Sequence, residues 1–408
     1  SRINRLGQSM LKFFPLPNYV DPDLALRYRQ NYKAAASGAH PRRNDMVRID
    51  LYPSEKLHAY FRWINDADDA DTPFQGFDFA YTIIRHPNPG HGYAGHVTYT
   101  FSPTLLNEVT LGKSWNSWQW APKDPEAVLR SRLGEVPQWF ANQLSTKIPS
   151  EAVDAKMLPN LQFGGTPVNA PGVTINNIQH VNHNDTWDVT DNLSWVRGAH
   201  SFKTGVYLNF TDKVQVHGDA WNGVFNFGVN RNNPFDSGHG YANALLGNFD
   251  TYMESTRGIN FHAKYWSAEF YAQDNWRVNK KLTLDYGVRF YHLEPQIDLN
   301  YTFAAFDAQA YDHGKAPRLY TPGFDAQKKR VAVDPKTGEA MPVVLIGKYV
   351  PGSGDYANGM RIGGQEGYPG GLYTARALSV APRFGFAYDV FGKGKTVIRG
   401  GAGVFLDR

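Results

Sequence analysis

The sequence predicts an all-β fold, namely part of an antiparallel, up-and-down transmembrane β-barrel with about 10–12 strands and long extracellular loops. Three observations predict this fold. Apolar and polar residues alternate with a period of two, in pairs of segments that a few turn residues join. Each segment has roughly the 9–11 residues that a tilted strand needs to cross a bilayer. Very long polar stretches, rich in Gly and Pro, separate the pairs, whereas a compact soluble domain rarely contains such loops.

Five pairs of segments carry the alternation. They are 44–52 with 58–65, 93–101 with 105–115, 187–196 with 201–210, 265–277 with 282–291, and 384–390 with 398–406. A sixth, weaker pair joins 223–229 to 248–255 and has a short helical turn at 242–247 between its segments. Up-and-down connectivity predicts that the long stretches 116–184 and 296–381 lie at one rim, opposite the turns at Pro53, Gly198 and Gly392.

One parity of each strand collects the apolar side chains, and this face is predicted to contact lipid. The residues are Val47, Ile49, Leu51, Phe61, Trp63, Val97, Tyr99, Val109, Leu111, Val206, Leu208, Leu284, Val288, Phe384 and Phe386. Trp residues lie toward several strand ends, where aromatic girdles form at membrane interfaces. A soluble β-sandwich or propeller would also alternate. It would, however, bury aliphatic side chains rather than mix Tyr, Phe and Trp with Ala and Gly on its apolar face.

Composition and charge exclude several classes of protein. The 408 residues hold 42 Lys and Arg against 38 Asp and Glu, a balance too even to predict a nucleic-acid partner. The absence of Cys excludes disulfide scaffolds, Cys-zinc sites and thiol nucleophiles. No apolar run reaches the roughly 18 residues of a membrane helix, and the longest candidate is the short stretch 343–346. Neither an initiator Met nor a signal peptide opens the sequence, which predicts a fragment or processed piece.

Several runs of residues resemble one family. FYAQDNWRV at 270–278, followed by LTLDYGVRF at 282–290, resembles the recurrent barrel hairpin of TonB-dependent outer-membrane receptors. More narrowly, FPLPN at 14–18, ALLGN at 244–248, APRFGFAYDV at 381–390 and IRGGAGVF at 398–405 resemble the Oar-like group of these receptors. Such receptors are similar in folding an N-terminal plug inside a barrel of ~22 strands.

The resemblance implies a function and partners. Residues 1–408 would form a partial barrel, without the plug, the Ton box, the carboxypeptidase-regulatory-like domain and the terminal strands. The implied activity is energised uptake of an unidentified ligand across the outer membrane of a Gram-negative-type bacterium. The implied partners are outer-membrane lipid, an extracellular ligand and the TonB complex, which would act through the N-terminal parts. The alternatives are a structural or adhesive barrel that displays its loops without transport, and a soluble carbohydrate-binding or hydrolytic β-protein.

The polar face of the predicted strands carries charged residues toward the lumen. They are Arg48, Asp50, Arg62, Glu108, Glu269, Asp285, Arg289, Arg383 and Arg399. They either line a substrate path or form internal ion pairs and plug contacts in a polar interior. In the fourth pair, both registers that suit its short turn bring Glu269 beside Arg289, directly opposite or one diagonal step away. We therefore expect an ion pair between these two residues.

Local motifs do not support catalysis or a cofactor. No nucleophile elbow and no HExxH sequence is present. Gly394-Lys395-Thr396 lacks the first Gly of a phosphate loop, because Asp389 stands at that position. The sequence therefore predicts neither an enzyme nor a bound cofactor.

An acidic cluster is a weak candidate for a metal site. Asp66, Asp68, Asp69 and Asp71 open a predicted loop at 66–92 and could chelate a hard cation such as calcium. The Gly and the distal Glu of an EF-hand are missing, and a solvated acidic loop is the simpler interpretation.

An aromatic loop is a candidate for ligand binding. In 218–241, Trp221, Phe225, Phe227 and Phe235 stand among Asn and Gly residues. Their rings could stack on a carbohydrate or a peptide. The same segment could instead be a hairpin extension that packs on its neighbours.

Overall fold

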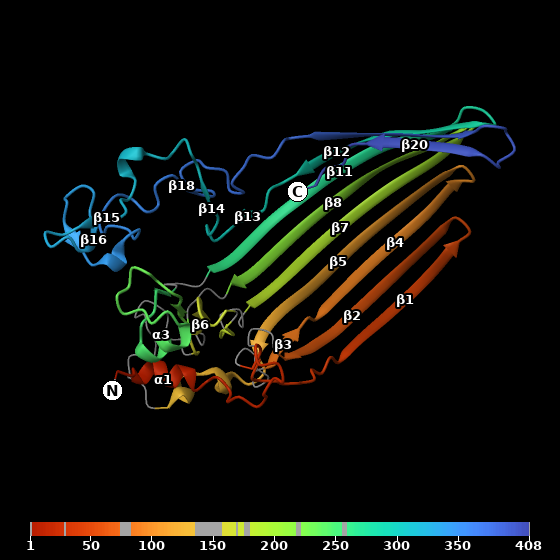
Figure 1. Cartoon of the computed structure of the whole chain (residues 1–408). Helices are drawn as coiled ribbons and strands as arrows, with labels where there is room; N and C mark the ends of the chain where they lie inside the picture. Colours follow the sequence, from red (N-terminus) through yellow and green to blue (C-terminus); the bar gives the residue numbers. More distant parts are fainter. Residues whose placement is uncertain are drawn as a thin grey trace.

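Ten long antiparallel strands form one curved wall (Figure 1). They are β1 (Arg42–Ser54), β2 (Leu57–Pro73), β4 (Gly90–Ser102), β5 (Leu105–Pro122), β7 (His180–Arg197), β8 (His200–His217), β11 (Ile259–Arg277), β12 (Leu282–Leu293), β19 (Ser379–Asp389) and β20 (Val397–Gly403). Two short strands, β3 (Ile83–Pro87) and β13 (Ile297–Asp298), complete a twelve-stranded sheet. The predicted antiparallel, up-and-down sheet is confirmed. The computed structural model describes residues 2–27, 30–73, 83–134, 157–168, 170–174, 180–217, 222–254 and 259–407.

All five predicted pairs are hairpins of this sheet, and most of their strands run further than the sequence indicates. The prediction of a loop at 66–92 is wrong over most of the described part of that stretch. β2 continues through the acidic cluster to Pro73 and pairs there with β3, and β4 already begins at Gly90. Asp has a low intrinsic preference for strands, which is why the sequence indicated a loop.

The register and the turns of the sheet follow the predicted parity. Tyr271 faces Arg289 across β11 and β12, which places Glu269 one diagonal step from Arg289. A two-residue turn joins β7 to β8, and its Gly198 has a φ of 61°, a conformation that glycine adopts without steric cost. In Figure 1 the short turns lie at the right-hand end of the sheet, and the long connections leave from the left-hand end. We call these the turn end and the loop end.

The long connections contain folded segments. The first loop module consists of α1 (Arg5–Leu11), η1 (Pro125–Val128), η2 (Arg130–Leu133), β6 (Asn160–Phe163), β9 (Val224–Phe227), α3 (Gly240–Leu246) and β10 (Thr251–Met253). β9 pairs antiparallel with β10 and parallel with β6, so the sixth predicted pair and its helical turn are confirmed. Met10, Val128, Met157, Leu161 and Phe227 are buried together in the core of this module.

The second loop module lies within 313–350. It consists of η4 (His313–Lys315), β15 (Thr321–Phe324), β16 (Arg330–Val333), β17 (Ala340–Met341) and η5 (Val343–Leu345), around a core of Tyr320, Ala332 and Val350. The pair β14 (Ala304–Phe306) and β18 (Met360–Ile362) flanks it along the chain. The hydrophobic cores of the described residues are thus centred at the loop end.

No helix in the described ranges is long and apolar enough to cross a membrane.

Candidate functional site

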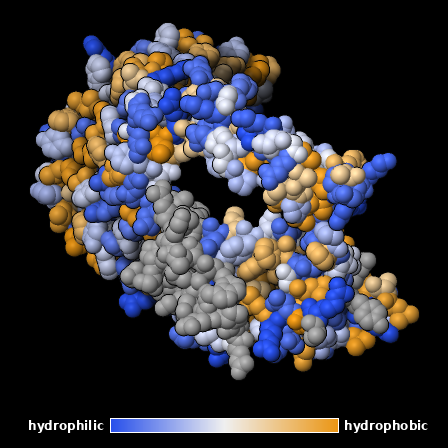
Figure 2. All heavy atoms as spheres, turned by 90° about the vertical axis from the view of Figure 1, so that its left-hand side faces the viewer, coloured by the Kyte–Doolittle hydropathy of each residue, from blue (hydrophilic) through white to orange (hydrophobic). Residues whose placement is uncertain are grey.

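The apolar face of the sheet lies on the outside of the wall. Of the fifteen side chains predicted there, eleven are between 36% and 55% exposed, and the other four, Trp63, Leu208, Leu284 and Val288, are half-buried. Figure 2, viewed from the loop end, shows hydrophobic side chains along the outer rim on the left and mostly hydrophilic side chains along the upper edge of a central hollow. This is the opposite of a soluble sandwich, in which the apolar faces close on each other.

Aromatic rings gather near both ends of the outer face. They are Trp195, Phe202 and Trp276 near the turn end, and Trp187, Phe210 and Trp266 toward the loop end. Trp195 and Phe202 face each other with ring centroids 5.6 Å apart. Two belts of this kind are typical of a sheet that crosses two membrane interfaces.

A row of polar and aromatic side chains crosses the inner face. Its cross-strand neighbours, one from each of nine strands, are Asp50, Tyr60, His96, Thr110, Thr190, Tyr207, Glu269, Tyr291 and Ser379. None of them is aliphatic. The sequence therefore builds a polar lumen wall from the same strands whose other parity is apolar.

Four of the nine charged residues predicted in the lumen form ion pairs. The Arg48 Nε lies 2.8 Å from Asp50, whose carboxylate also lies 3.0 Å from the His58 ring. The predicted pair between Arg289 and Glu269 is confirmed, with 2.6 Å between Nη2 and Oε2. These contacts fix the charged side chains against the wall.

The strand register places the other five predicted charges on the inner face as well. None of these five side chains forms an ion pair with another described residue. They are Arg62, Glu108, Asp285, Arg383 and Arg399. Asp285 and Arg383 line a hollow of 780 Å³ against the wall, together with Arg289, Tyr271 and Lys203. This part of the wall therefore offers charges of both signs to whatever occupies the lumen.

The acidic cluster lies on β2, and each of its four carboxylates lies beside a basic side chain. Asp66 pairs with Arg42 at 2.8 Å, Asp68 with His40 at 2.6 Å, Asp69 with Arg85, and Asp71 with Lys123. Because side chains alternate along a strand, the four do not converge on one point. In the part of the chain that the structure describes, no group of three His, Asp or Glu residues is placed to hold a metal ion.

The aromatic loop is divided between the core and the surface. Phe225 and Phe227 are only 8% and 2% exposed and belong to the core of the first loop module, so they are not free to stack on a ligand. The alternative, an extension that packs on its neighbours, describes these two residues. Phe235 is 70% exposed, and Trp221 lies outside the described residues.

Phe235 lines a cleft between the two loop modules that the sequence did not predict. The cleft has a volume of 590 Å³ and is bounded by 230–250 on one side and 325–348 on the other. Lys329, Arg330 and Lys348 lie on its wall, beside Val343 and Leu345 of η5. The run of three basic residues at 328–330 and the apolar run at 343–346 were the available signals, but only the fold brings them together.

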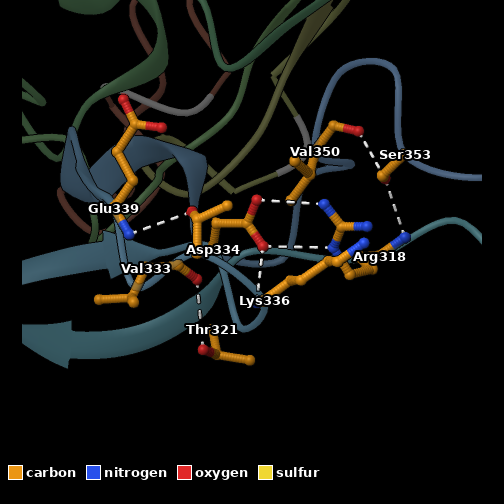
Figure 3. Close-up of polar contacts among 9 residues, drawn as sticks. Arg318, Thr321, Val333, Asp334, Lys336, Glu339, Val350 and Ser353 are labelled. Carbon is orange, nitrogen blue, oxygen red and sulfur yellow. Dashed lines mark hydrogen bonds and ion pairs between the residues drawn. The ribbon is translucent and has the colours of Figure 1, made fainter.

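An ion pair fastens the second loop module next to the cleft (Figure 3). The Arg318 guanidinium donates two hydrogen bonds of 3.2 Å to the buried carboxylate of Asp334, which also accepts a bond of 2.9 Å from the backbone N–H of Lys336. The Ser353 hydroxyl accepts from the Arg318 backbone N–H at 3.0 Å and donates to the Val350 carbonyl. These bonds hold β15, β16 and the segment after η5 together.

Asp334 should make the second loop module sensitive to acid. The hydrogen bonds from Arg318 and Lys336 hold the pKa of the Asp334 carboxyl below its usual range. Ionised Asp334 therefore stabilises the fold above the pKa of an unfolded aspartate, about 3.9, and this contribution is lost as the pH falls through the lower pKa of the folded state. Urea unfolding between pH 6 and pH 2 should show that Asp334→Asn weakens this pH dependence. An unchanged pH dependence would contradict the assignment.

Comparison with known proteins places the whole chain in one family. The family model described as an outer membrane beta barrel domain matches residues 1–408. The chain belongs to this outer membrane β-barrel family. No curated protein matches the sequence.

Several solved transporter structures are similar to this chain. The outer membrane transporter YddB from Escherichia coli is 9% identical over 90% of this chain and 32% of its own, with a TM-score of 0.38. The copper transporter OprC is 10% identical over 89% of this chain and 37% of its own, with a TM-score of 0.40. The RagAB peptide importer is 9% identical over 86% of this chain and 38% of its own, with a TM-score of 0.32. The chain thus spans about a third of the length of these structures.

Because the chain belongs to this family, the surroundings of the two faces of its sheet can be assigned. The protein resides in the outer membrane, so the apolar outer face contacts lipid and the aromatic belts mark the two interfaces. In such barrels short turns are periplasmic and long loops are extracellular. We therefore expect the turn end of the sheet to face the periplasm, and the loop end, with the two modules and the cleft, to lie outside the cell.

The Glu269–Arg289 pair of the β-barrel wall should contribute little to stability. Both side chains are partly exposed to the lumen, where water weakens the attraction. A double-mutant cycle with Glu269→Gln and Arg289→Gln should give a coupling energy of about 0.5 kcal/mol, decreasing at high salt. A coupling of several kcal/mol, independent of salt, would show that this part of the lumen is dry.

Proposed function

We propose that this chain is the barrel part of an Oar-like TonB-dependent receptor that takes up a large or scarce ligand across the outer membrane. The loop modules capture the ligand outside the cell, and the polar lumen provides its path. A plug inside the barrel, encoded in another part of the full-length protein, is displaced by TonB from the inner membrane and opens that path.

One observation carries this proposal. A ligand-sized cleft between the loop modules lies at the same end of the sheet as the mouth of the central hollow (Figure 2). Transmembrane barrels have a polar interior, and a ligand held in the cleft lies outside the mouth of that interior. The nine-strand polar row and the unpaired charges beside Tyr271 supply such an interior.

The edges of the sheet support a partial barrel. In the described residues β1 pairs only with β2, and β20 pairs only with β19. Unpaired backbone N–H and C=O groups are costly in lipid, so both edges need partners. We propose that further strands of the same full-length protein pair with β1 and β20 and close the barrel.

The test compares uptake by cells with and without the gene for the full-length protein. Both strains grow in a hydrolysate of protein and polysaccharide, and mass spectrometry follows the loss of each solute from the medium. Each culture is repeated with a protonophore, which removes the energy source of TonB. We expect at least one solute whose uptake requires both the gene and the proton gradient.

Two outcomes would overturn the proposal. Uptake that requires the gene but not the proton gradient would indicate a passive pore. Unchanged uptake of every solute, together with reduced attachment of the deletion strain to surfaces, would favour the structural or adhesive barrel.

A further inference from the structure

We propose that the cleft between the two loop modules binds an anion that carries an apolar group, as an acidic peptide or an aromatic carboxylic acid does. This inference rests on the proposed capture role of the loop modules. The cleft volume of 590 Å³ falls within the roughly 300–1,000 Å³ that is typical of small-ligand sites. Its chemistry is set by three basic side chains and an apolar floor.

The three bases of the cleft are available to a ligand. Lys329, Arg330 and Lys348 are exposed on its wall, and none of them forms an ion pair with another residue in the described ranges. Elsewhere in the same module, Arg318 is neutralised by Asp334 and Lys315 lies beside Asp312. The bases at the cleft therefore differ from these two in lacking an internal partner.

The acidic residues of the cleft are already engaged. Asp325 accepts hydrogen bonds from the backbone N–H groups of Gln327 and Lys329, at 2.9 and 2.8 Å. Asp250 accepts a bond of 2.6 Å from the Asn230 side-chain amide. These hydrogen bonds turn both carboxylates toward local donors, and three bases against two acids leave the cleft wall with a formal charge of +1, so the net field that a ligand meets is positive.

The apolar part of the cleft comes from both modules. Phe235 and Phe249 are exposed on the side of the first loop module, and Val343, Val344 and Leu345 of η5 lie on the other side. Exposed aromatic rings opposite aliphatic side chains bury the apolar group of a ligand favourably. A purely hydrophilic anion such as phosphate would leave this surface in water.

The charge of the whole chain is concentrated at this module. Residues 313–350 contain seven Lys and Arg and three Asp and Glu, a formal charge of +4, which equals the formal charge of all 408 residues. The remainder of the chain is therefore neutral overall. A positive extracellular module on a neutral protein attracts anions toward the cleft, and this attraction weakens with salt.

The test measures binding of two matched peptides to the purified full-length protein in detergent by titration calorimetry. The acidic probe is acetyl-Glu-Phe-Glu-amide, and the neutral probe is acetyl-Gln-Phe-Gln-amide, which has nearly the same shape. A third probe, 2-naphthoate, distinguishes an aromatic acid from a peptide. We expect the acidic peptide or 2-naphthoate to bind at least tenfold more tightly than the neutral peptide, and less tightly as salt is raised.

Variants locate the site. The triple variant Lys329→Gln, Arg330→Gln, Lys348→Gln should weaken binding of the anionic probe roughly tenfold, whereas it should leave the neutral peptide unchanged. The control variant Lys280→Gln, Lys393→Gln, Lys395→Gln removes the same charge from exposed turns at the other end of the sheet and should change binding less than twofold. Phe235→Ala should weaken both peptides, because it removes the apolar contact.

Three results would overturn the inference. They are no binding of any anionic probe, equal binding of the acidic and neutral peptides, or an equal loss of affinity in the cleft and control variants. If binding fails while gene-dependent, energised uptake is observed, the cleft inference alone is wrong. If binding succeeds while uptake is unchanged in the deletion strain, the proposed transport function is wrong and the cleft serves another role.

Discussion

Replacing Leu111 with arginine is expected to lower the free energy of unfolding of the barrel in phospholipid vesicles by about 2–4 kcal/mol. Leu111 lies in the middle of the part of β5 that runs from the β4–β5 turn to Trp115. Its side chain is 49% exposed on the outer face, and its cross-strand neighbours are Gly95 and Val189. Neither of these direct neighbours can pair with a guanidinium, and the Asp191 carboxylate, one diagonal step away on the same face, already accepts a hydrogen bond from the Asn107 amide. The charge would therefore be placed near the middle of the bilayer, where its desolvation is least compensated.

Thr110→Arg is the matched control for this substitution. Thr110 is the next residue of β5 and points to the lumen, where the His96 ring nitrogen lies 2.8 Å from its hydroxyl. An arginine there remains in contact with water, and we expect a loss below about 1 kcal/mol. Urea titrations followed by tryptophan fluorescence measure both values. Equal losses for the two variants would contradict the assignment of the lipid face.

Phe227→Ala is expected to destabilise the first loop module by about 3–5 kcal/mol, the cost of emptying a well-packed aromatic site. Phe227 is 2% exposed, and its ring centroid lies 5.6 Å from that of Phe163 on β6 and 5.9 Å from that of Phe225. Hydrogen exchange at the β6 and β9 amides should accelerate accordingly, while the amides of the sheet keep their protection. Protection of β6 and β9 close to that of the unmodified protein would show that Phe227 is not a core residue.

Phe235→Ala provides the comparison within the same stretch of sequence. This side chain is 70% exposed, so its removal should change the stability of the module by less than about 0.5 kcal/mol. The contrast separates a core role for Phe227 from a surface role for Phe235. A large destabilisation by Phe235→Ala would mean that its ring holds the module together, and its use in the cleft would then be in doubt.

The sheet was predictable from sequence because its signals are local. Alternation along 282–291 and a short turn determine which residues of β11 and β12 face each other, so the Glu269–Arg289 contact follows from parity alone. The position of the polar lumen face follows from the same parity. Long loops against short turns were enough to assign the two rims.

Apart from the β9–β10 pair and the helical turn between them, the loop modules were not predictable, because their contacts are distant in sequence. β6 and β9 are parallel neighbours more than sixty residues apart, and nothing in the Gly- and Asn-rich sequence around Phe225 and Phe227 shows that a strand will cover them. The cleft likewise joins 230–250 to 325–348. The acidic stretch of β2 was predicted to be a loop for another reason. The basic residues that pair with its aspartates, Arg42, Arg85 and Lys123, come from other segments. These pairs stabilise aspartates in a strand, although Asp has a low strand preference.

The orientation of the wall in the outer membrane is the central claim, and thiol labelling of intact cells tests it most directly. The 408 residues contain no Cys, so a single introduced Cys is the only thiol of this region. Gln327→Cys in the second loop module and Ala199→Cys in the β7–β8 turn are both exposed positions at opposite ends of the sheet. With a maleimide that cannot cross the outer membrane, we expect Gln327→Cys to react in intact cells and Ala199→Cys to react only after the membrane is permeabilised. Labelling of Ala199→Cys in intact cells, or protection of Gln327→Cys, would contradict the account.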